Sequence, residues 1–301
     1  MRMGGERTVW PSSTAGTPDG RGLLQALVGD GLPLLAVTAL ALMFSGGFAL
    51  FLTVTRQFLP HDIDYLQVSA AELCALADCR VTDFMLHDRA AFGGALIAIG
   101  VLYLWLITFP LHAREPWAWW TVAITGFVGF LSFLAYFGYG YLDTWHGTAT
   151  LFLLPCFLLG LALSYGRLDS PRDVRSIVRA GAGVSPTSSF GIGRLLLLAT
   201  AGGMIAGGGT ILVIGMTKVF VPQDLTFMGV LPEQLHAVNP RLVPLIAHDR
   251  AGFGCAIGVH FAVGYTDFVH LGPAIVGAVL FAAGLLLTYG RMHRAEPAPA
   301  R

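Results

Sequence analysis

Six stretches of this 301-residue chain run for at least 20 residues without any Asp, Glu, Lys or Arg. A helix needs about 20 predominantly apolar residues to cross the hydrocarbon core of a bilayer. Charged residues make up 12% of the chain, about half of the share in a typical soluble domain. The sequence therefore predicts an all-α, polytopic transmembrane helix bundle with spans at 34–55, 90–111, 116–142, 147–166, 195–217 and 271–290.

Three pairs of segments recur in the same order along the chain. They are SGGFALFLTVTRQFLPHD (45–62) with GGGTILVIGMTKVFVPQD (207–224), FMLHDRAAFGG (84–94) with LIAHDRAGFGC (245–255), and GYLDTWHG (140–147) with GYTDFVHL (264–271). Similar segments in a fixed order indicate an internal duplication. We expect a first repeat at 33–168 and a second repeat at 195–292.

The two predicted repeats differ in length. The first would hold four transmembrane helices and an outer loop at 57–88, whereas the second is shortened and has its outer loop at 219–250. In the second repeat only the 16 residues 251–266 separate the His-Asp-Arg triplet from the next Asp, too few to cross and return as two helices. A re-entrant segment there gives six spans, which we favour, and a single short crossing gives seven. A disordered tail at 1–32, a linker at 169–194 and a tail at 293–301 complete the predicted organisation.

The distribution of basic residues predicts the orientation. With six spans, one face of the membrane carries both tails, the linker and 12 Arg, and the opposite face carries six basic residues. The positive-inside rule makes the first face cytoplasmic, so we expect a multi-pass protein of a bacterial cytoplasmic membrane with a cytoplasmic N-terminus. Because an even number of spans separates the repeats, they would be parallel and related by an axis along the membrane normal.

A His-Asp-Arg triplet stands before an apolar run in each repeat, at 87–89 and 248–250. Consecutive residues on a helix point about 100° apart, so the three side chains must divide their roles. Asp88 and Asp249 are predicted to be structural N-caps of the following helices. The basic members would contact loop carbonyls, lipid phosphates, a buried carboxylate or a substrate group, and they are His87, Arg89, His248 and Arg250.

An Asp-x-x-His pair occurs once in each repeat, as Asp143 with His146 and as Asp267 with His270. Residues three apart share a helix face, so the Asp can fix the imidazole tautomer and raise its basicity for proton transfer. The alternative is that each Asp caps a helix. A metal or haem site is a further candidate, although there is no His-x-x-x-His pair and no Glu-x-x-His pair of the kind that marks di-iron bundles, and its ligands would be His87, His146, His248 and His270.

The outer loops contain helix-start signals and one cysteine pair. Ser69 and Glu72 have the spacing of a capping box, and Pro232 suits the first position of a helix. Short helices here would lie over the mouth of the bundle as a lid or as interfacial packing. Cys74 and Cys79 lie on the predicted oxidising side and are candidates for a disulfide.

These patterns favour a membrane-embedded enzyme that acts on a lipid-soluble substrate of the quinone or polyprenoid type. Its catalytic residues would be the Asp-x-x-His pairs together with the His and Arg of the triplets. A transporter with two pseudo-symmetric halves and a non-catalytic anchor or accessory subunit are the alternatives, and burial of Asp62 or Asp224 would favour transport. The expected partners are the lipid bilayer and either another membrane protein or further copies of this chain. The zero net charge argues against nucleic acid.

Overall fold

The computed structural model describes residues 28–77, 79–138, 144–169, 173–176, 185–251 and 268–292, without the side chains of 132–138, 144–146, 251, 268–274 and 289–292. Every regular element in these ranges is helical. In chain order the elements are α2 (Leu32–Val54), α3 (Pro60–Leu66), α4 (Ala70–Ala77), α5 (Cys79–Leu106), the π-helix η1 (Ile107–Leu111), α6 (Pro116–Gly138), α7 (Thr144–Tyr165), α9 (Ser189–Thr217), α10 (Pro222–Met228), α11 (Pro232–Val238), α12 (Leu242–Ala251) and α14 (Phe268–Met292).

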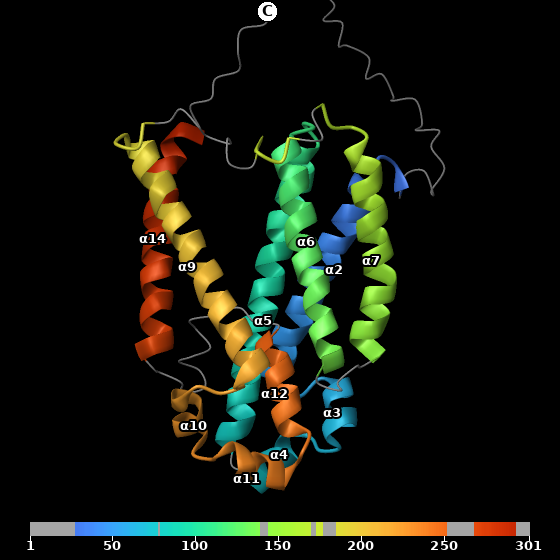
Figure 1. Ribbon diagram of the computed structural model, residues 1–301, viewed down its shortest axis with the longest axis vertical. Helices are drawn as coiled ribbons and strands as arrows, with labels where there is room; N and C mark the ends of the chain where they lie inside the picture. Colours follow the sequence, from blue (N-terminus) through green and yellow to red (C-terminus); the bar gives the residue numbers. More distant parts are fainter. Residues whose placement is uncertain are drawn as a thin grey trace, which may run out of the picture.

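The long helices run along the longest axis of the molecule, and the short helices gather at one end (Figure 1). Four helical stretches are long and apolar enough to cross a membrane: α2, α5 with η1, α9, and the 147–165 part of α7. Shorter apolar helical stretches lie in α6 and α14. The chain is therefore an all-helical protein compatible with a membrane environment. Figure 1 also shows α2 and α9 running in the same direction toward the short helices.

Helix α5 begins at Cys79, well before the apolar run that predicted it. Asp88 is consequently an interior helical residue, and Asp249 lies in the last turn of α12, so the predicted N-cap roles of both are wrong. The physical reason is that the polar residues at the start of α5 find partners across helix interfaces. Arg56, for example, forms an ion pair with Asp83 at 2.5 Å. A helix can therefore continue beyond its apolar segment.

Glycines allow the closest helix contact in the first half of the chain, between α2 and α5. A Cβ atom added to Gly46 would lie 2.4 Å from the carbonyl oxygen of Gly93, and one added to Gly93 would lie 2.8 Å from that of Gly46. Further along α5, a Cβ on Gly100 would lie 2.7 Å from the carbonyl oxygen of Ala39. Small residues let backbones approach where the lipid supplies no hydrophobic drive between helices. This half has its own core at the end remote from the short helices, including Leu35, Tyr103, Leu106, Val122, Phe157 and Leu161.

A second core joins the short helices of both halves. Asn239 donates a hydrogen bond to the carbonyl of Leu66 at 2.8 Å, and Arg241 donates one to the carbonyl of Tyr65 at 2.5 Å. Both halves therefore form one packed unit at this end. Its buried hydrophobic side chains include Phe58, Leu66, Leu73, Phe84, Met85, Phe220, Met228, Leu235, Leu242 and Ile246.

The predicted helix-start signals in the loops are confirmed. The backbone N–H of Ser69 donates to Glu72 at 2.7 Å, the N–H of Glu72 donates back to the Ser69 hydroxyl at 3.2 Å, and Pro232 is the first residue of α11. These hydrogen bonds hold the pKa of Glu72 below its ordinary value. Cys74 in α4 is disulfide-bonded to Cys79 at the start of α5.

Helices α9 and α14 pack on each other, again through glycine. Added Cβ atoms on Gly193 and Gly284 would each lie 3.0 Å from the other residue's carbonyl oxygen. Further along α9, a Cβ on Gly207, Gly208 or Gly209 meets nothing within 4 Å. The aligned glycine segments of the two halves are thus used differently in the parts of the chain described.

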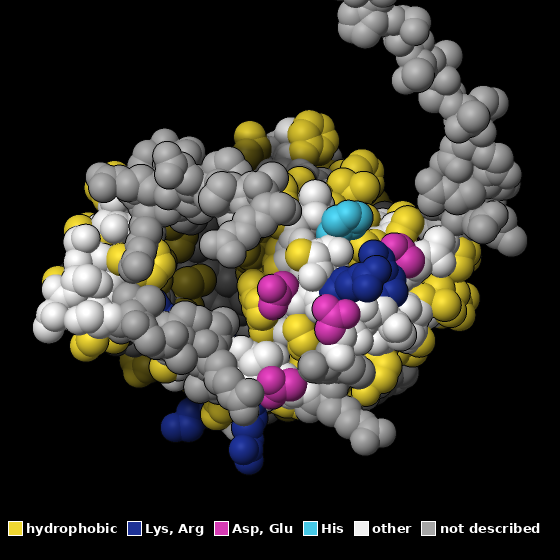
Figure 2. Space-filling view, turned by 90° about the horizontal axis from the view of Figure 1, so that it is seen from above, with side chains coloured by type: hydrophobic (Ala, Val, Ile, Leu, Met, Phe, Trp, Pro, Cys, Tyr) yellow, Lys and Arg dark blue, Asp and Glu magenta, His cyan; other side chains and the backbone are white. Residues whose placement is uncertain are grey.

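The other end of the bundle, seen from above in Figure 2, carries a small group of charged side chains among hydrophobic and other groups. Arg167 pairs there with Asp30, and Arg114 pairs with Asp169 at 3.9 Å. The predicted tails at 1–32 and 293–301 and the 251–266 segment lie wholly or mostly outside the described residues, as do 170–172 and 177–184 of the predicted linker at 169–194.

Candidate functional site: a buried ionic network at the end of an apolar cavity

The Pro-x-Asp segments start two short helices and bury one carboxylate each. Pro60 and Pro222 occupy the first positions of α3 and α10, where a missing backbone N–H leaves no helical hydrogen bond unmade. Asp62 accepts a hydrogen bond from the backbone N–H of Leu59 at 3.1 Å, and Asp224 accepts one from Val221 at 2.7 Å. Both side chains are almost fully buried. Each cap therefore holds a carboxylate at a fixed position inside the protein.

Each triplet arginine pairs with the capping carboxylate of its own half. Arg89 on α5 lies 2.5 Å from Asp62, and Arg250 on α12 lies 2.6 Å from Asp224, both measured from guanidinium nitrogen to carboxylate oxygen. In both pairs the arginine approaches the oxygen that also accepts the backbone hydrogen bond. The two halves thus form matching local arrangements around equivalent residues.

Each arginine also reaches the triplet aspartate of the other half. Arg89 donates from two nitrogens to Asp249, each at 3.2 Å, and Arg250 donates to Asp88 at 3.4 Å. Asp88 and Asp249, predicted as helix caps, are therefore ionic partners that join α5 to α12. We call these six side chains the ionic network: Asp62, Asp88, Arg89, Asp224, Asp249 and Arg250.

Aromatic rings cover the faces of both guanidinium groups. The Arg89 carbon lies 5.1 Å from the centre of the Phe58 ring, and the Arg250 carbon lies 4.9 Å from the centre of the Phe84 ring. Both distances fit cation–π contacts. Each arginine is about 5% exposed, so its ion pairs and its contact with the ring are buried.

The triplet histidines lie beside the neighbouring aspartates. The Nδ1 atom of His248 is 2.9 Å from an oxygen of Asp249, and the Nδ1 atom of His87 is 3.3 Å from an oxygen of Asp88. Burial opposes ionisation of Asp249, but the charge of Arg89 and the hydrogen bond with His248 outweigh it and hold the pKa of this carboxyl below its ordinary value. An aspartate that accepts from Nδ1 leaves Nε2 as the basic nitrogen of the ring.

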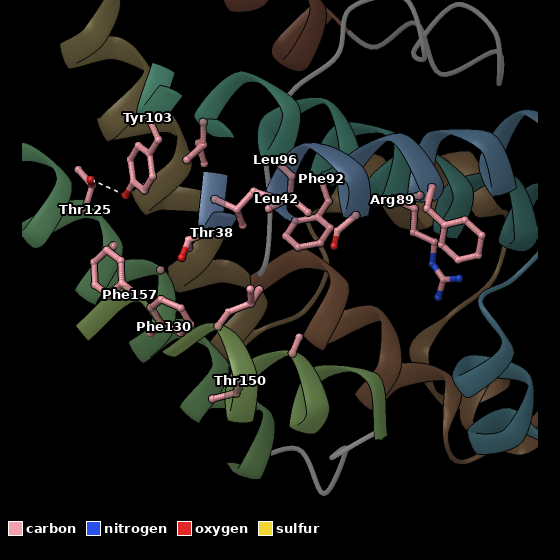
Figure 3. Close-up of a pocket in the computed structure, with 18 of the residues that line it drawn as sticks. Thr38, Leu42, Arg89, Phe92, Leu96, Tyr103, Thr125, Phe130, Thr150 and Phe157 are labelled. Carbon is pink, nitrogen blue, oxygen red and sulfur yellow. Dashed lines mark hydrogen bonds between the residues drawn. The ribbon is translucent and has the colours of Figure 1, made fainter. Parts of the chain in front are cut away.

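A cavity of about 420 Å³ extends from the ionic network into the first half of the molecule. Figure 3 shows Arg89 at one end and the hydrogen-bonded pair of Tyr103 and Thr125 at the other. Arg89 and Tyr103 are 14 residues apart on α5, which corresponds to about 21 Å of helix. The walls between them are mainly apolar and come from α2, α5, α6 and α7, including Leu42, Phe92, Leu96, Phe130, Leu153 and Phe157.

Among the described lining residues, the charged side chains gather at one end of this cavity. Its lining there comes from the start of α3, from α5 and from α12, so both halves contribute. The charged and titratable groups that line it are His61, Asp62, Asp88, Arg89, His248 and Asp249. A volume of this size is within the range of sites for small molecules, and an apolar pocket with a few convergent polar groups is typical of them.

The structure unites both triplets, as their placement on one face of the membrane predicted, but it leaves the Asp-x-x-His pairs open. Asp143 and Asp267 lie outside the described residues, and the side chains of His146 and His270 are not described. The proton-transfer role predicted for these four residues therefore stays a prediction. Within the described ranges, no three His, Cys, Asp or Glu side chains are grouped as metal ligands.

Two carboxylates of the network, Asp62 and Asp224, were not predicted as site residues. The signal was present, because the Pro-x-Asp motif occurs at the same place in both aligned segments. Spacing alone could not show that each would face an arginine 26 or 27 positions further on. That contact depends on how α3 and α10 fold back against α5 and α12.

Comparisons with known proteins give no identity: no family model, curated protein or solved structure matches this chain. What the geometry defines is an all-helical protein with several membrane-compatible helices, a buried ionic network and an apolar cavity that ends at the network. The site itself is therefore the basis for a functional assignment.

Proposed function

We propose that this chain is a multi-pass membrane enzyme that binds a lipid-soluble substrate of the quinone or polyprenoid type in the cavity. The observation that carries the proposal is the continuity of one apolar cavity with the ionic network. A hydrophobic chain would lie among α2, α5, α6 and α7, and its polar group would lie beside Arg89 and His248. The aligned segments and the matching ion pairs support two related, parallel halves with six or seven spans.

In this proposal His248 is the acid–base residue. Asp249 holds the Nδ1 side of the ring, so Nε2 can accept or return a proton at the polar group of the substrate. Arg89 keeps Asp249 ionised and fixes its position. His87 forms a similar pair with Asp88 but is not among the residues that line the cavity. The proposal therefore departs from the sequence-based expectation that His87 is catalytic and uses it as a matched control for the same residue type.

Lipid extraction from the purified protein tests the binding site. Gly129 lines the cavity, and a Cβ added there meets nothing within 4 Å, so Gly129→Leu fills space without a backbone clash. Gly47 is an equally open position outside the cavity lining. We expect mass spectrometry to find a co-purified isoprenoid lipid with wild type and Gly47→Leu, and to find several-fold less with Gly129→Leu. Equal lipid content in all three proteins would contradict the proposal.

Conversion of membrane lipids tests the enzymatic role. Incubating the protein with a lipid extract and comparing masses over time should show one lipid consumed by wild type and by His87→Gln, but not by His248→Gln. If both histidine variants convert the lipid like wild type, His248 is not the acid–base residue.

Transport is a second candidate, and one observation favours it. Asp62 and Asp224 are buried at about 1% and 0% exposure between the two halves, where a carrier would hold a proton-binding carboxylate. Proton flux into proteoliposomes that stops in both Asp62→Asn and Asp224→Asn, with no lipid converted, would favour transport over catalysis.

The proposed location is the cytoplasmic membrane of a bacterium, with the N-terminus in the cytoplasm and the ionic network near the outer face. The excess of Arg on the side of the termini supports this orientation. Alkaline phosphatase fused at the C-terminus should be inactive in cells, whereas insertion into the loop between α3 and α4 should give an active reporter.

A further inference from the structure

The polar end of the cavity carries a charge that restricts its ligand. The groups that line it comprise three carboxylates, one guanidinium and two imidazoles: Asp62, Asp88, Asp249, Arg89, His61 and His248. Their formal charge is −2 when both imidazoles are neutral and zero when both are protonated. With its carboxylates ionised, the described lining is therefore not positive in either state of the imidazoles. An anionic head group would meet a neutral or negative surface in either state.

Arg89, the single arginine among the described lining residues, is already engaged by protein carboxylates. Asp249 accepts two hydrogen bonds from Arg89, Asp62 pairs with a third nitrogen, and Phe58 covers one face of the guanidinium. A phosphate at Arg89 would have either to displace one of these carboxylates or to lie beside them as a third negative group. Displacement would leave a nearly buried aspartate without its counter-charge, which is costly in a low-dielectric site.

The groups that line the polar end instead suit a ligand that donates hydrogen bonds. Ionised carboxylates only accept hydrogen bonds, and a neutral imidazole offers one accepting nitrogen. A hydroxyl group can donate to such a surface without adding charge. Since burying an unpaired charge costs more than burying a hydrogen-bonded hydroxyl, the head group should be uncharged.

We propose that the cavity selects an isoprenoid lipid whose head group is a hydroxyl, as in a prenyl alcohol or a quinol, and excludes prenyl phosphates. This proposal rests on the proposed lipid-binding cavity and narrows its substrate class. It also assigns Asp249 and Asp62 a specificity role, because they neutralise Arg89, the one permanent cation among the described lining residues.

Saturable binding of probes to the full chain in detergent micelles tests the selection. The probes are geranylgeraniol, geranylgeranyl phosphate, which has the same tail, and decylubiquinol. We expect geranylgeraniol or decylubiquinol, or both, to bind about tenfold tighter than the phosphate or better, a difference of about 1.4 kcal/mol. Comparing the two hydroxyl probes tells which lipid class the site prefers.

Two variants make the result specific to the cavity. Gly129→Leu should remove the saturable binding of the preferred probe, and Gly47→Leu should retain it. Asp249→Asn, tested if its melting temperature shows a folded protein, should narrow the preference against phosphate because it releases Arg89 from one carboxylate. If that variant does not fold, the wild-type ratio decides alone.

The failures are distinguishable. Tighter binding of the phosphate than of both hydroxyl probes, lost in Gly129→Leu, would overturn the selection and leave the cavity as a lipid site. Absence of any saturable binding that Gly129→Leu removes would overturn both the selection and the proposed function.

Discussion

The two halves of this chain share sequence motifs. The contacts of the polar motifs are alike in both halves, whereas the packing of the glycine motifs differs. Around the ionic network the halves match closely, with Asp62–Arg89 corresponding to Asp224–Arg250. In the apolar helices they do not match, because Gly46 on α2 touches Gly93 on α5 whereas the aligned Gly208 on α9 meets open space among the described residues. Buried charges need particular partners, while apolar faces accept many, so the polar motifs constrain the geometry more tightly.

Loss of either network arginine should have the largest effect and should be similar in both halves. Arg89→Met and Arg250→Met each leave buried carboxylates without a counter-charge, which destabilises by about 3–5 kcal/mol. The control is Arg56→Met. Arg56 lies 2.5 Å from Asp83, but the arginine side chain is exposed, so loss of this ion pair should destabilise the protein by at most about 1 kcal/mol. Thermal unfolding in detergent measures the stability of all three variants. A small destabilisation by Arg250→Met beside a large one by Arg89→Met would show that the two ion pairs are not equivalent.

Glycine substitutions should show the opposite behaviour, with unequal effects at aligned positions. Gly46→Ala forces α2 and α5 apart, because the new Cβ would meet a backbone oxygen, and should destabilise by about 1–3 kcal/mol. The new Cβ of Gly208→Ala meets no atom of the described residues within 4 Å and the substitution gains helix propensity, so it should be neutral or stabilise by up to about 1 kcal/mol. Equal destabilisation by both substitutions would mean that α9 packs as tightly at this point as α2 does.

Acid should expose a smaller contribution from Asp249. Its pKa is lowered in the folded protein, so its stabilisation is present above the unfolded aspartate pKa of about 3.9 and is lost as the pH falls through the folded value. The melting temperature of wild type should thus decline below about pH 4, and Asp249→Asn should start lower at neutral pH and decline less. Protonation of Glu72 in the exposed capping box should cause a separate loss of stability in acid, because its pKa is also lowered. The Glu72→Gln variant lacks this contribution and serves as the control. An equally steep acid decline in Asp249→Asn and wild type would contradict the assignment.

The sequence predicted the parts of this architecture that depend on local pattern. Charge-free runs predicted the long helices, and the capping signals at Ser69 and Pro232 predicted the starts of α4 and α11. The role of Asp88 was predicted incorrectly because the apolar run does not mark the start of α5.

The exchange of partners between halves was beyond prediction from spacing. Arg89 meets Asp249 at 160 positions of separation, a contact that exists only because α12 packs against α5. Helix geometry indicated that the triplet side chains diverge, which holds for each arginine but not for each histidine, whose ring lies beside the neighbouring aspartate. It could not supply the residues that the arginines meet. A sequence pattern fixes directions along one helix, whereas a site requires the relative placement of several.

The central claim is that one cavity, in the first half, holds the hydrophobic chain of the substrate. Photolabelling with a diazirine analogue of geranylgeraniol, followed by peptide mass spectrometry, tests it most directly. We predict labels on cavity residues such as Phe92, Leu96 and Leu153, lost in Gly129→Leu and kept in Gly47→Leu. Labels spread equally over the exposed apolar faces of α9 and α14, and unchanged by Gly129→Leu, would contradict the claim.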